Sequence, residues 1–219
     1  MRYRRDMTTE RTLDWKANHD PKSWNFLTAT ALTDVTSRLW TLGNPVLDQG
    51  TEGACVGFGV TNTVSAHPVK LRLSHPLQTA LGMYYGARRV DDFPGEAYSG
   101  TSVTAGCKMA VEMGFASGYR WAMGVEALAL AILNESPAVI GVPWTEGMFT
   151  PDNNGLIHAT GAVQGGHCVC VRGFNRHTNL FRIRQSWGIS HGLNGDVFLS
   201  YADMDTILQQ NGECAVLTK

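Results

Sequence analysis

The spacing of hydrophobic positions changes along this chain, from helical periods in the first half to short apolar runs in the second. Helices are predicted at residues 54–66, 77–90, 101–113 and 125–133. Strands are predicted at residues 137–142, 165–174, 180–186 and 196–200, where apolar runs are separated by turn residues. Helices gathered before strands indicate an α+β fold of two lobes with a cleft between them.

The predicted helix at residues 54–66 carries two glycines, Gly57 and Gly59. Each costs about 1 kcal/mol of helix propensity relative to alanine. A helix that tolerates both is held by close packing on several sides, so we expect this helix to be buried between the two lobes.

The composition and charge of the chain indicate a globular protein and argue against several other classes. Of the 219 residues, 43% are hydrophobic and 17% charged, which is typical of a globular protein. The net charge of −1 provides no field that would attract nucleic acid or an anionic membrane. The longest apolar run, residues 127–133, is too short to span a bilayer, and no apolar segment follows the basic N-terminus as in a signal peptide.

Candidate chemistry begins in the loop that opens the first helix, DQGTEGACVGF at residues 48–58. Cys55 falls in the first helical turn, where the positive end of the helix dipole favours a thiolate. Gln49, six residues earlier, has a side-chain amide that can donate a hydrogen bond. A thiolate beside an amide donor is half of an acyl-transfer site.

The other half lies downstream, in GGHCVCV at residues 165–171 and RQSWG at residues 184–188. His167 supplies a base, and Gln185 supplies an amide that can orient the base. Nucleophile, base and orienting group in this order are typical of a thiol protease. Strand alternation points Cys168 and Cys170 away from His167, and no C-x-x-C pair exists, so we expect no metal site and no cofactor.

These three motifs resemble those of the papain-like cysteine peptidases. DQGTEGACVGF is similar to that family's D-Q-G-x-C-G-x-C-W-A-F, and GGHCVCVRGFN is similar to its G-x-H-A-V-x-x-V-G-Y. RQSWGISHGLNGDVF resembles its N-S-W-G-x-x-W-G-x-x-G-Y. The motifs occur in the family's order and cover residues 36–219.

The resemblance implies a papain-like fold: a helical lobe, an antiparallel β-barrel-like lobe and an active site in the cleft. It implies an N-terminal arm at residues 1–35, a helical lobe at 36–124 and a β lobe at 125–219, with 36–219 as one catalytic unit. It also implies peptide or protein substrates and the following site residues: Cys55 as nucleophile, His167 as base, Gln185 as orienting group, Gln49 as oxyanion donor, Gly100 and Gly166 against the substrate backbone, and Trp187 shielding the histidine.

The chain departs from the family pattern at several positions. Gln185 stands where the family has asparagine, and His191 replaces a tryptophan. Glu52 replaces a disulfide cysteine, which together with an odd count of five cysteines favours a reducing, cytoplasmic or otherwise intracellular location. In its short arm and its missing disulfide, the chain is similar to intracellular bacterial or virus-associated members of the family. The arm itself is expected to pack on the surface, with an inhibitory or targeting segment as the alternative.

Three functions use the same residues. The first is a cysteine peptidase that works through a thiolate–imidazolium pair and an acyl-enzyme. The second is a catalytically silent module for binding or assembly, suggested by Gln185. The third is an acyl transferase, in which an amine replaces water. The retention of Gln49, Cys55 and His167 together favours the peptidase.

Overall fold

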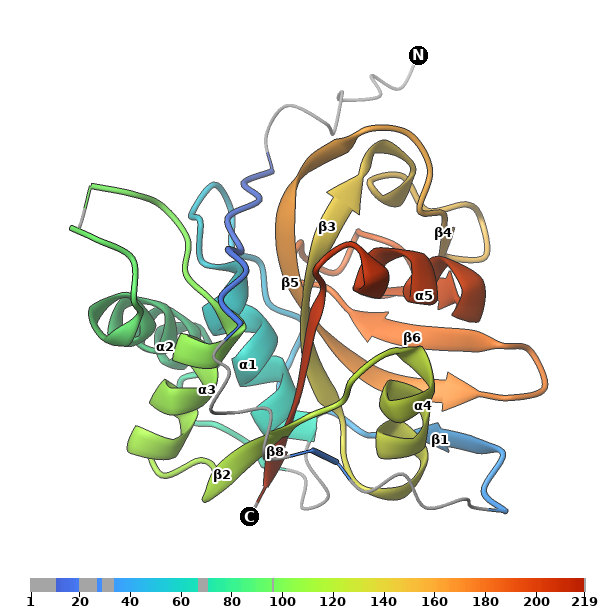
Figure 1. The fold of residues 1–219 in the computed structure, drawn as a ribbon, viewed down its shortest axis with the longest axis horizontal. Helices are drawn as coiled ribbons and strands as arrows, with labels where there is room; N and C mark the ends of the chain where they lie inside the picture. The colour runs from blue at the N-terminus through green and yellow to red at the C-terminus, as the bar shows by residue number, and fades with distance from the viewer. Residues whose placement is uncertain (1–10, 20–26, 29–33, 67–70, 96, 219) are drawn as a thin grey trace.

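The computed structural model describes residues 11–19, 27–28, 34–66, 71–95 and 97–218. Its helices fall into two groups on either side of a central sheet (Figure 1). One group consists of α1 (Cys55–Ala66), α2 (Pro76–Val90) and α3 (Val103–Glu112). The other consists of α4 (Val125–Asn134), the short 3-10 helix Glu146–Met148 and α5 (Tyr201–Gln209).

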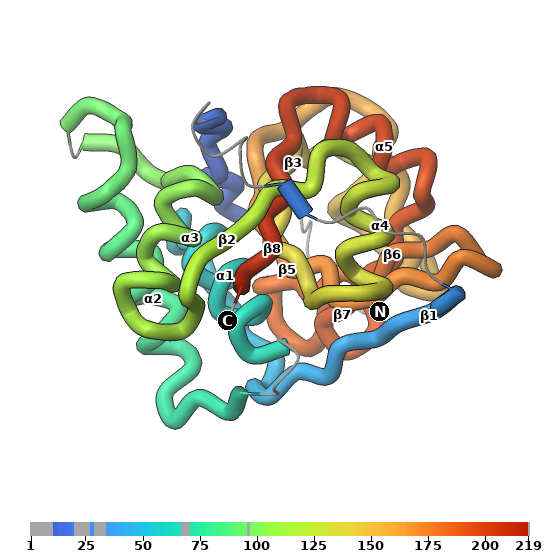
Figure 2. Tube along the Cα trace, turned by 60° about the horizontal axis from the view of Figure 1, so that its bottom comes forward, coloured from blue at the N-terminus to red at the C-terminus, as the bar shows by residue number. Residues whose placement is uncertain are grey.

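The sheet of the described residues has the strand order β2-β8-β3-β5-β6-β7-β4, with β1 pairing β5 off this path. The strands are β1 (Ser37–Leu39), β2 (Gly118–Trp121), β3 (Ala138–Thr145), β4 (Leu156–Ile157), β5 (Val163–Asn175), β6 (Leu180–Arg184), β7 (Asp196–Ser200) and β8 (Glu213–Thr218). All pairs are antiparallel except β4 with β7. The tube trace shows β2 and β8 beside the helices α1 and α3, so these strands join the two halves (Figure 2).

Helix α1 is the centre of the packing, because every one of its residues is buried. A side chain at Gly57 would clash with the Ala80 carbonyl oxygen of α2, and one at Gly59 would press on Cys168 of β5. The two glycines therefore let α2 and β5 approach the helix backbone from two sides. The close packing expected from these glycines is confirmed.

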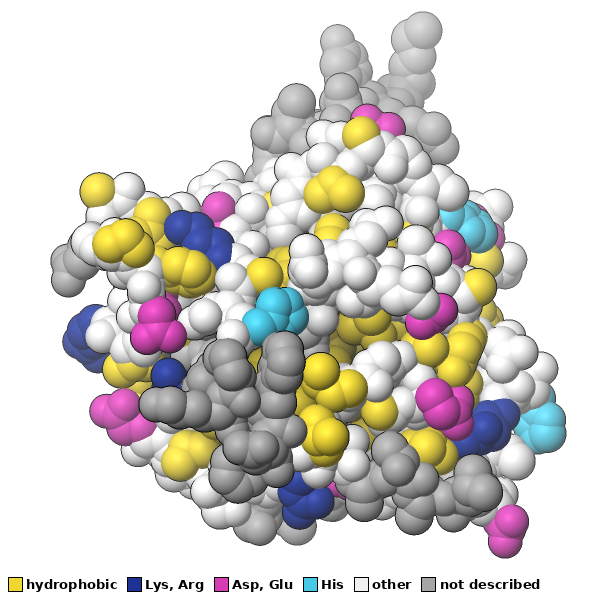
Figure 3. Space-filling view, viewed as in Figure 1, with side chains coloured by type: hydrophobic (Ala, Val, Ile, Leu, Met, Phe, Trp, Pro, Cys, Tyr) yellow, Lys and Arg dark blue, Asp and Glu magenta, His cyan; other side chains and the backbone are white. Residues whose placement is uncertain are grey.

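Two large apolar clusters form the core. One fills the space between the sheet and helices α4 and α5, with Leu128, Ile140 and Phe181 among its fully buried members. The other surrounds α1 and α3 and includes Cys55 and Trp15. On the face shown in Figure 3, a few basic and acidic side chains are scattered among apolar and uncharged polar ones.

The α+β architecture expected from the sequence is confirmed, and the four predicted helices begin and end within two residues of their observed bounds. The strand predicted at 137–142 continues to Thr145, since its tryptophan and threonine also face the core. The sequence analysis missed β1, β2, β4, α5 and β8. None of the helices in the described ranges has the length and apolarity that a membrane crossing requires.

The expected surface arm is wrong for residues 11–18. Trp15 is buried, and this segment makes backbone bridges to β5 at Gly166 and to Thr101 ahead of α3. In Figure 1 the segment descends beside α1, between the helical side and the sheet. Residues 1–10, 20–26 and 29–33 of the predicted arm lie outside the described residues. The lobe boundary at residue 124 stays a prediction.

Candidate functional site

The candidate nucleophile, Cys55, is the first residue of α1. The loop before it turns at Gly50, whose φ is +60° and whose N–H donates to Asp48 Oδ1 at 2.9 Å. Hydrogen bonds from the backbone of Asp14, Cys168 and Val56 lower the pKa of the thiol, so each is donated by an N–H. The backbone of this region thus favours a thiolate at Cys55.

Burial opposes that effect and is the larger of the two. Complete desolvation, with a smaller contribution from the carboxylate of Asp14, raises the pKa of Cys55 to about 11. With residues 11–18 in place, the thiol is therefore neutral at pH 7. The resting thiolate expected from the sequence is not the form that this structure favours.

The histidine and glutamine expected to act together do lie in contact. The His167 Nε2 and Gln185 Oε1 atoms are 2.9 Å apart, and both side chains are fully buried. Because the amide oxygen only accepts, Nε2 carries the proton and Nδ1 is the basic nitrogen. His167 Nδ1 has no hydrogen-bond partner among the described residues. Glutamine therefore orients the ring in the way expected of asparagine in the family.

Aromatic rings enclose His167. The Trp187 ring stacks on it at 4.5 Å and 18°, and Trp144 meets it edge-on at 4.8 Å. The shielding role expected of Trp187 fits this contact. Desolvation lowers the pKa of His167 to about 4, with Arg11 adding to the effect and the hydrogen bond to Gln185 opposing it. The imidazole is therefore neutral at pH 7 in this state.

His191, which stands at the position of a family tryptophan, packs edge-on against Trp187 at 4.9 Å. It is buried, although no pattern of neighbouring residues predicted a place in the core. Burial lowers its pKa to about 3, so it serves as a neutral ring in the wall behind His167.

Both the oxygen and the nitrogen of the Gln49 side-chain amide form hydrogen bonds. Its Oε1 accepts from Ser186 Oγ at 2.6 Å, and its Nε2 donates to the Glu52 carbonyl oxygen at 2.8 Å. The same Nε2 lies 3.4 Å from the carbonyl oxygen of Thr12. The amide predicted to hold an oxyanion therefore already faces a carbonyl oxygen supplied by the arm.

Residues 11–18 run through the cleft between the nucleophile helix and the sheet. The Trp15 N–H donates to the Gly166 carbonyl at 2.9 Å, and the Lys16 N–H donates to the Thr101 carbonyl at 3.0 Å. Gly166 thus pairs with an extended backbone, as expected of a substrate-binding residue. The pairing predicted for Gly100 falls one residue later, on Thr101, because Gly100 is turned at φ +83°.

The arm meets the site at Asp14. The backbone of Asp14 lowers the pKa of the Cys55 thiol, and a side chain at Gly100 would clash with the Asp14 carbonyl oxygen. Ser99 Oγ holds the Asp14 carboxylate at 2.9 Å, and the Arg11 guanidinium lies 4.5 Å from the centre of the Trp187 ring. The carbonyl of Asp14 is therefore held against Gly100.

The sequence analysis missed four residues that shape the site: Asp14, Trp15, Thr101 and Glu213. Trp15 was visible as an isolated aromatic residue in a polar arm, but its position in the cleft had no local signal. In the described part of the chain, no group of three or more His, Cys, Asp or Glu side chains is arranged to hold a metal ion.

Comparison with known proteins identifies the class of fold. No protein-family model matches the chain. An uncharacterized peptidase C1-like protein of Acanthamoeba polyphaga mimivirus is 22% identical over 199 aligned residues, which cover 71% of this chain and 64% of that protein. The chain therefore spans somewhat less than two thirds of that relative.

Solved structures of cysteine proteases share the whole architecture. Xylellain from Xylella fastidiosa superimposes with a TM-score of 0.75 at 16% identity, over 95% of this chain and 96% of that one. Procathepsin L 3 of Tenebrio molitor gives 0.65 at 16% identity, over 94% and 76%. Bromelain from Ananas comosus gives 0.54 at 17% identity, over 84% and 98%. The chain has the papain-like fold, and the resemblance seen in its motifs is confirmed.

Proposed function

We propose that this chain is a cysteine peptidase that hydrolyses peptide bonds with Cys55 and His167, and that residues 11–18 hold it in a blocked form. The observation that carries the proposal is the arrangement around the base. Gln185 takes Nε2 of His167 and leaves Nδ1 without a hydrogen-bond partner, while the backbone of the next residue, Cys168, lies close enough to the Cys55 thiol to lower its pKa.

The mechanism follows from these positions. His167 takes the thiol proton, and the Cys55 sulfur attacks the substrate carbonyl carbon. The Gln49 amide stabilises the developing oxyanion, an interaction typically worth about 3 kcal/mol. His167 then protonates the leaving amine and later activates the water that releases the acyl-enzyme. Gln185 keeps the ring in one orientation through both steps.

The neutral state of the pair fits a blocked enzyme. Burial is the largest cause of both pKa shifts, and the Asp14 carboxylate on the arm further disfavours a thiolate. Displacement of the arm admits water and substrate, which removes much of the desolvation. All five cysteines are buried and free, in keeping with activity in a reducing compartment.

The experiment measures cleavage of a library of quenched fluorescent peptides by the full chain and by Trp15→Gly, which weakens the hold of the arm. We expect Trp15→Gly to cleave faster than the parent chain. Adding Cys55→Ala removes cleavage, whereas Cys170→Ala, at another buried thiol, retains it. Unchanged cleavage in the Cys55→Ala chain would refute the assignment of the nucleophile.

The same experiment separates the peptidase from its alternatives. A silent binding module cleaves nothing in either background. An acyl transferase consumes peptide faster when a free amine is added and yields the amide product in place of the acid, which mass spectrometry distinguishes.

A further inference from the structure

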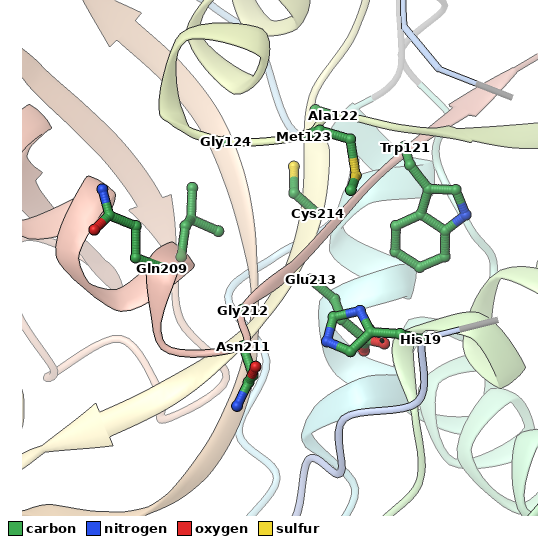
Figure 4. Close-up of a pocket in the computed structure, with 11 residues that line it drawn as sticks. His19, Trp121, Ala122, Met123, Gly124, Gln209, Asn211, Gly212, Glu213 and Cys214 are labelled. Carbon is green, nitrogen blue, oxygen red and sulfur yellow. Dashed lines mark ion pairs between the residues drawn. The ribbon is translucent and has the colours of Figure 1, made fainter. Parts of the chain in front are cut away.

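Two carboxylates in the described part of the chain are almost completely buried, and their surroundings differ in charge. Glu213 lines the surface pocket of about 330 Å³ drawn in Figure 4, where the His19 imidazole lies 3.9 Å from it. Asp196, at the start of β7, is surrounded by three guanidinium groups instead. Because arginine is always charged, three positive charges against one negative charge leave an excess of two at Asp196.

The three arginines, which together with Asp196 form the Asp196 cluster, come from β5 and β6: Arg172, Arg182 and Arg184. Arg172 donates to both carboxylate oxygens, from Nε to Oδ1 at 3.2 Å and from Nη2 to Oδ2 at 2.6 Å. Arg182 Nε donates to Oδ2 at 2.7 Å. Arg184 Nε lies 2.9 Å from Oδ1 without the angle of a hydrogen bond, so this buried N–H has no acceptor among the described residues. One carboxylate therefore does not satisfy all three guanidinium groups.

Two of these arginines are enclosed and the third reaches the surface. The side chains of Arg172 and Arg184 are each 8% exposed. Nη1 of Arg172 donates to the Trp40 carbonyl oxygen at 2.8 Å. Nη1 of Arg184 donates to the Asn194 carbonyl oxygen at 2.7 Å. Arg182 is 32% exposed, and its two Nη groups form no hydrogen bond with any other described residue. Arg182 therefore presents a free pair of N–H donors to solvent, at the edge of a buried positive charge.

The Asp196 cluster is particular to this chain. In the motifs that resemble the papain-like pattern, Arg172 stands at a valine of that pattern and Asp196 at a tyrosine. Gly195 has a φ of +79°, and a side chain there would clash with Arg184 Nη1. Burial lowers the pKa of Arg184, and the charges of Arg172 and Arg182 act in the same direction, against the attraction of Asp196. Buried charge in excess is costly unless another group neutralises it, so the cluster favours a bound anion.

We propose that the Asp196 cluster binds a small molecule through a dianionic phosphate group, with Arg182 as the direct contact. A phosphate monoester carries nearly two negative charges at pH 7, which matches the excess of two positive charges. The planar guanidinium of Arg182 offers parallel N–H donors to two phosphate oxygens. A carboxylate ligand would neutralise only half of the excess. The inference does not depend on the proposed peptidase function, because the ligand is bound and not cleaved.

Thermal unfolding of the full chain measures this binding. Sodium phosphate, sulfate or acetate is added at equal ionic strength, with sodium chloride as the reference. We expect phosphate and sulfate to raise the melting temperature by about 3 °C or more at a tenfold excess over the dissociation constant, and acetate to have no such effect. Arg182→Gln should lose most of this rise, whereas Arg120→Gln, at an exposed arginine on β2, should keep it. An equal rise in Arg182→Gln and in the parent would overturn the proposal.

A purely structural role for the arginines predicts a different result. Loss of a partner from a buried ion pair that only holds the fold lowers stability. Removal of a surplus charge leaves Asp196 with two arginines, so we expect the ligand-free Arg182→Gln chain to melt within about 2 °C of the parent. A clearly lower melting temperature of this variant, together with no effect of any anion on the parent, would assign the cluster to the fold alone and overturn the proposal.

Calorimetry with methyl phosphate and with sulfate tests the charge of the ligand. The second pKa of a phosphate monoester is about 6, whereas sulfate stays a dianion. Between about pH 7 and pH 5, we expect the affinity for methyl phosphate to fall about tenfold relative to that for sulfate, which experiences the same changes in the protein. Arg182→Lys keeps the charge but loses the planar fork, so it should weaken the binding of both anions. An equal pH dependence for the two anions, or unchanged affinity in Arg182→Lys, would contradict the proposal.

Discussion

At the scale of single residues, the main question raised by the sequence concerns Gln185. Its extra methylene relative to asparagine could have moved the amide oxygen away from the histidine, yet the oxygen lies 2.9 Å from His167 Nε2. The backbone N–H of Gln185 donates to the Gly195 carbonyl at 2.9 Å, which fixes the start of the side chain. The backbone at residue 185 therefore lies at the distance from His167 that a glutamine side chain spans.

Shortening this side chain should therefore weaken the site. Gln185→Asn would withdraw the amide oxygen by more than an ångström, and misplacement on that scale costs about 10²-fold in rate. We expect a fall of this size in kcat for peptide cleavage in the Trp15→Gly background, with the melting temperature nearly unchanged. Gln164→Asn, at an exposed amide, is the matched control. Equal kcat values for Gln185→Asn and its parent would show that Gln185 does not position the base.

At the scale of elements, α1 determines how close the helical side comes to the sheet. Its glycines at positions 57 and 59 face α2 and β5 respectively. The intrinsic cost of glycine in a helix is outweighed by the packing that the missing side chains permit. This explains why a helix with two interior glycines can hold Cys55 in a fixed position.

Two glycine substitutions test this account against simple helix propensity. Gly57→Ala should lower the free energy of unfolding by about 1–3 kcal/mol, because its side chain would meet the Ala80 carbonyl and overpack the contact. Gly82→Ala, in α2 with nothing within 4 Å, should raise it by about 0.5–1 kcal/mol. Chemical denaturation of both variants measures the difference. Stabilisation by Gly57→Ala would contradict the close approach of α2.

At the scale of the whole molecule, the arm joins the two halves. It bonds to Gly166 on the sheet side and to Thr101 on the helical side, and its residues Asp14 and Arg11 add to the pKa shifts of Cys55 and His167 respectively. The pKa of His167 is lowered to about 4 and that of Cys55 raised to about 11, so both are neutral between these values.

This predicts a distinct pH profile for alkylation of Cys55 by iodoacetamide, followed by peptide mass mapping. In the full chain, labelling should be slow at pH 7 and should rise only as the pH approaches 11, because the thiolate is the reactive form. In Trp15→Gly, reduced desolvation should shift the profile to lower pH. Cys170, whose pKa burial also raises to about 11, is the internal control. Rapid labelling of Cys55 at pH 7 in the full chain would contradict a blocked site.

The sign of the accompanying stability change follows from the same shifts. Burial lowers the pKa of His167 from its ordinary value of 6.5 to about 4, so the unfolded chain takes up a proton at a higher pH than the folded chain. The stability that this group contributes is therefore lost as the pH falls from 6.5 through about 4. Burial raises the pKa of the Cys55 thiol from its ordinary value of 9.0 to about 11, so the unfolded chain loses this proton at a lower pH than the folded chain. The stability that the thiol contributes is therefore lost as the pH rises from 9.0 through about 11.

The sequence by itself determined the local features of this protein. Hydrophobic spacing located the four main helices and the central strands, and the chain order of Cys55, His167 and Gln185 indicated the chemistry of the site. Such features depend on neighbours within a few residues, or on motifs that keep their order along the chain. Short segments such as β2 and β8 were missed, because their pairing partners lie far away in the sequence.

Only the tertiary structure decided what fills the cleft. The bond from Trp15 to Glu213 joins residues 198 positions apart, and neither residue belongs to a motif. Arg11 above Trp187 and Asp14 beside the Cys55 thiol are likewise residues outside any motif, far in the sequence from the groups that they contact. A local pattern cannot encode which distant surfaces meet, since that depends on how the whole core packs. The nucleophile and base could therefore be proposed from the sequence, whereas their neutral, buried state follows from the fold.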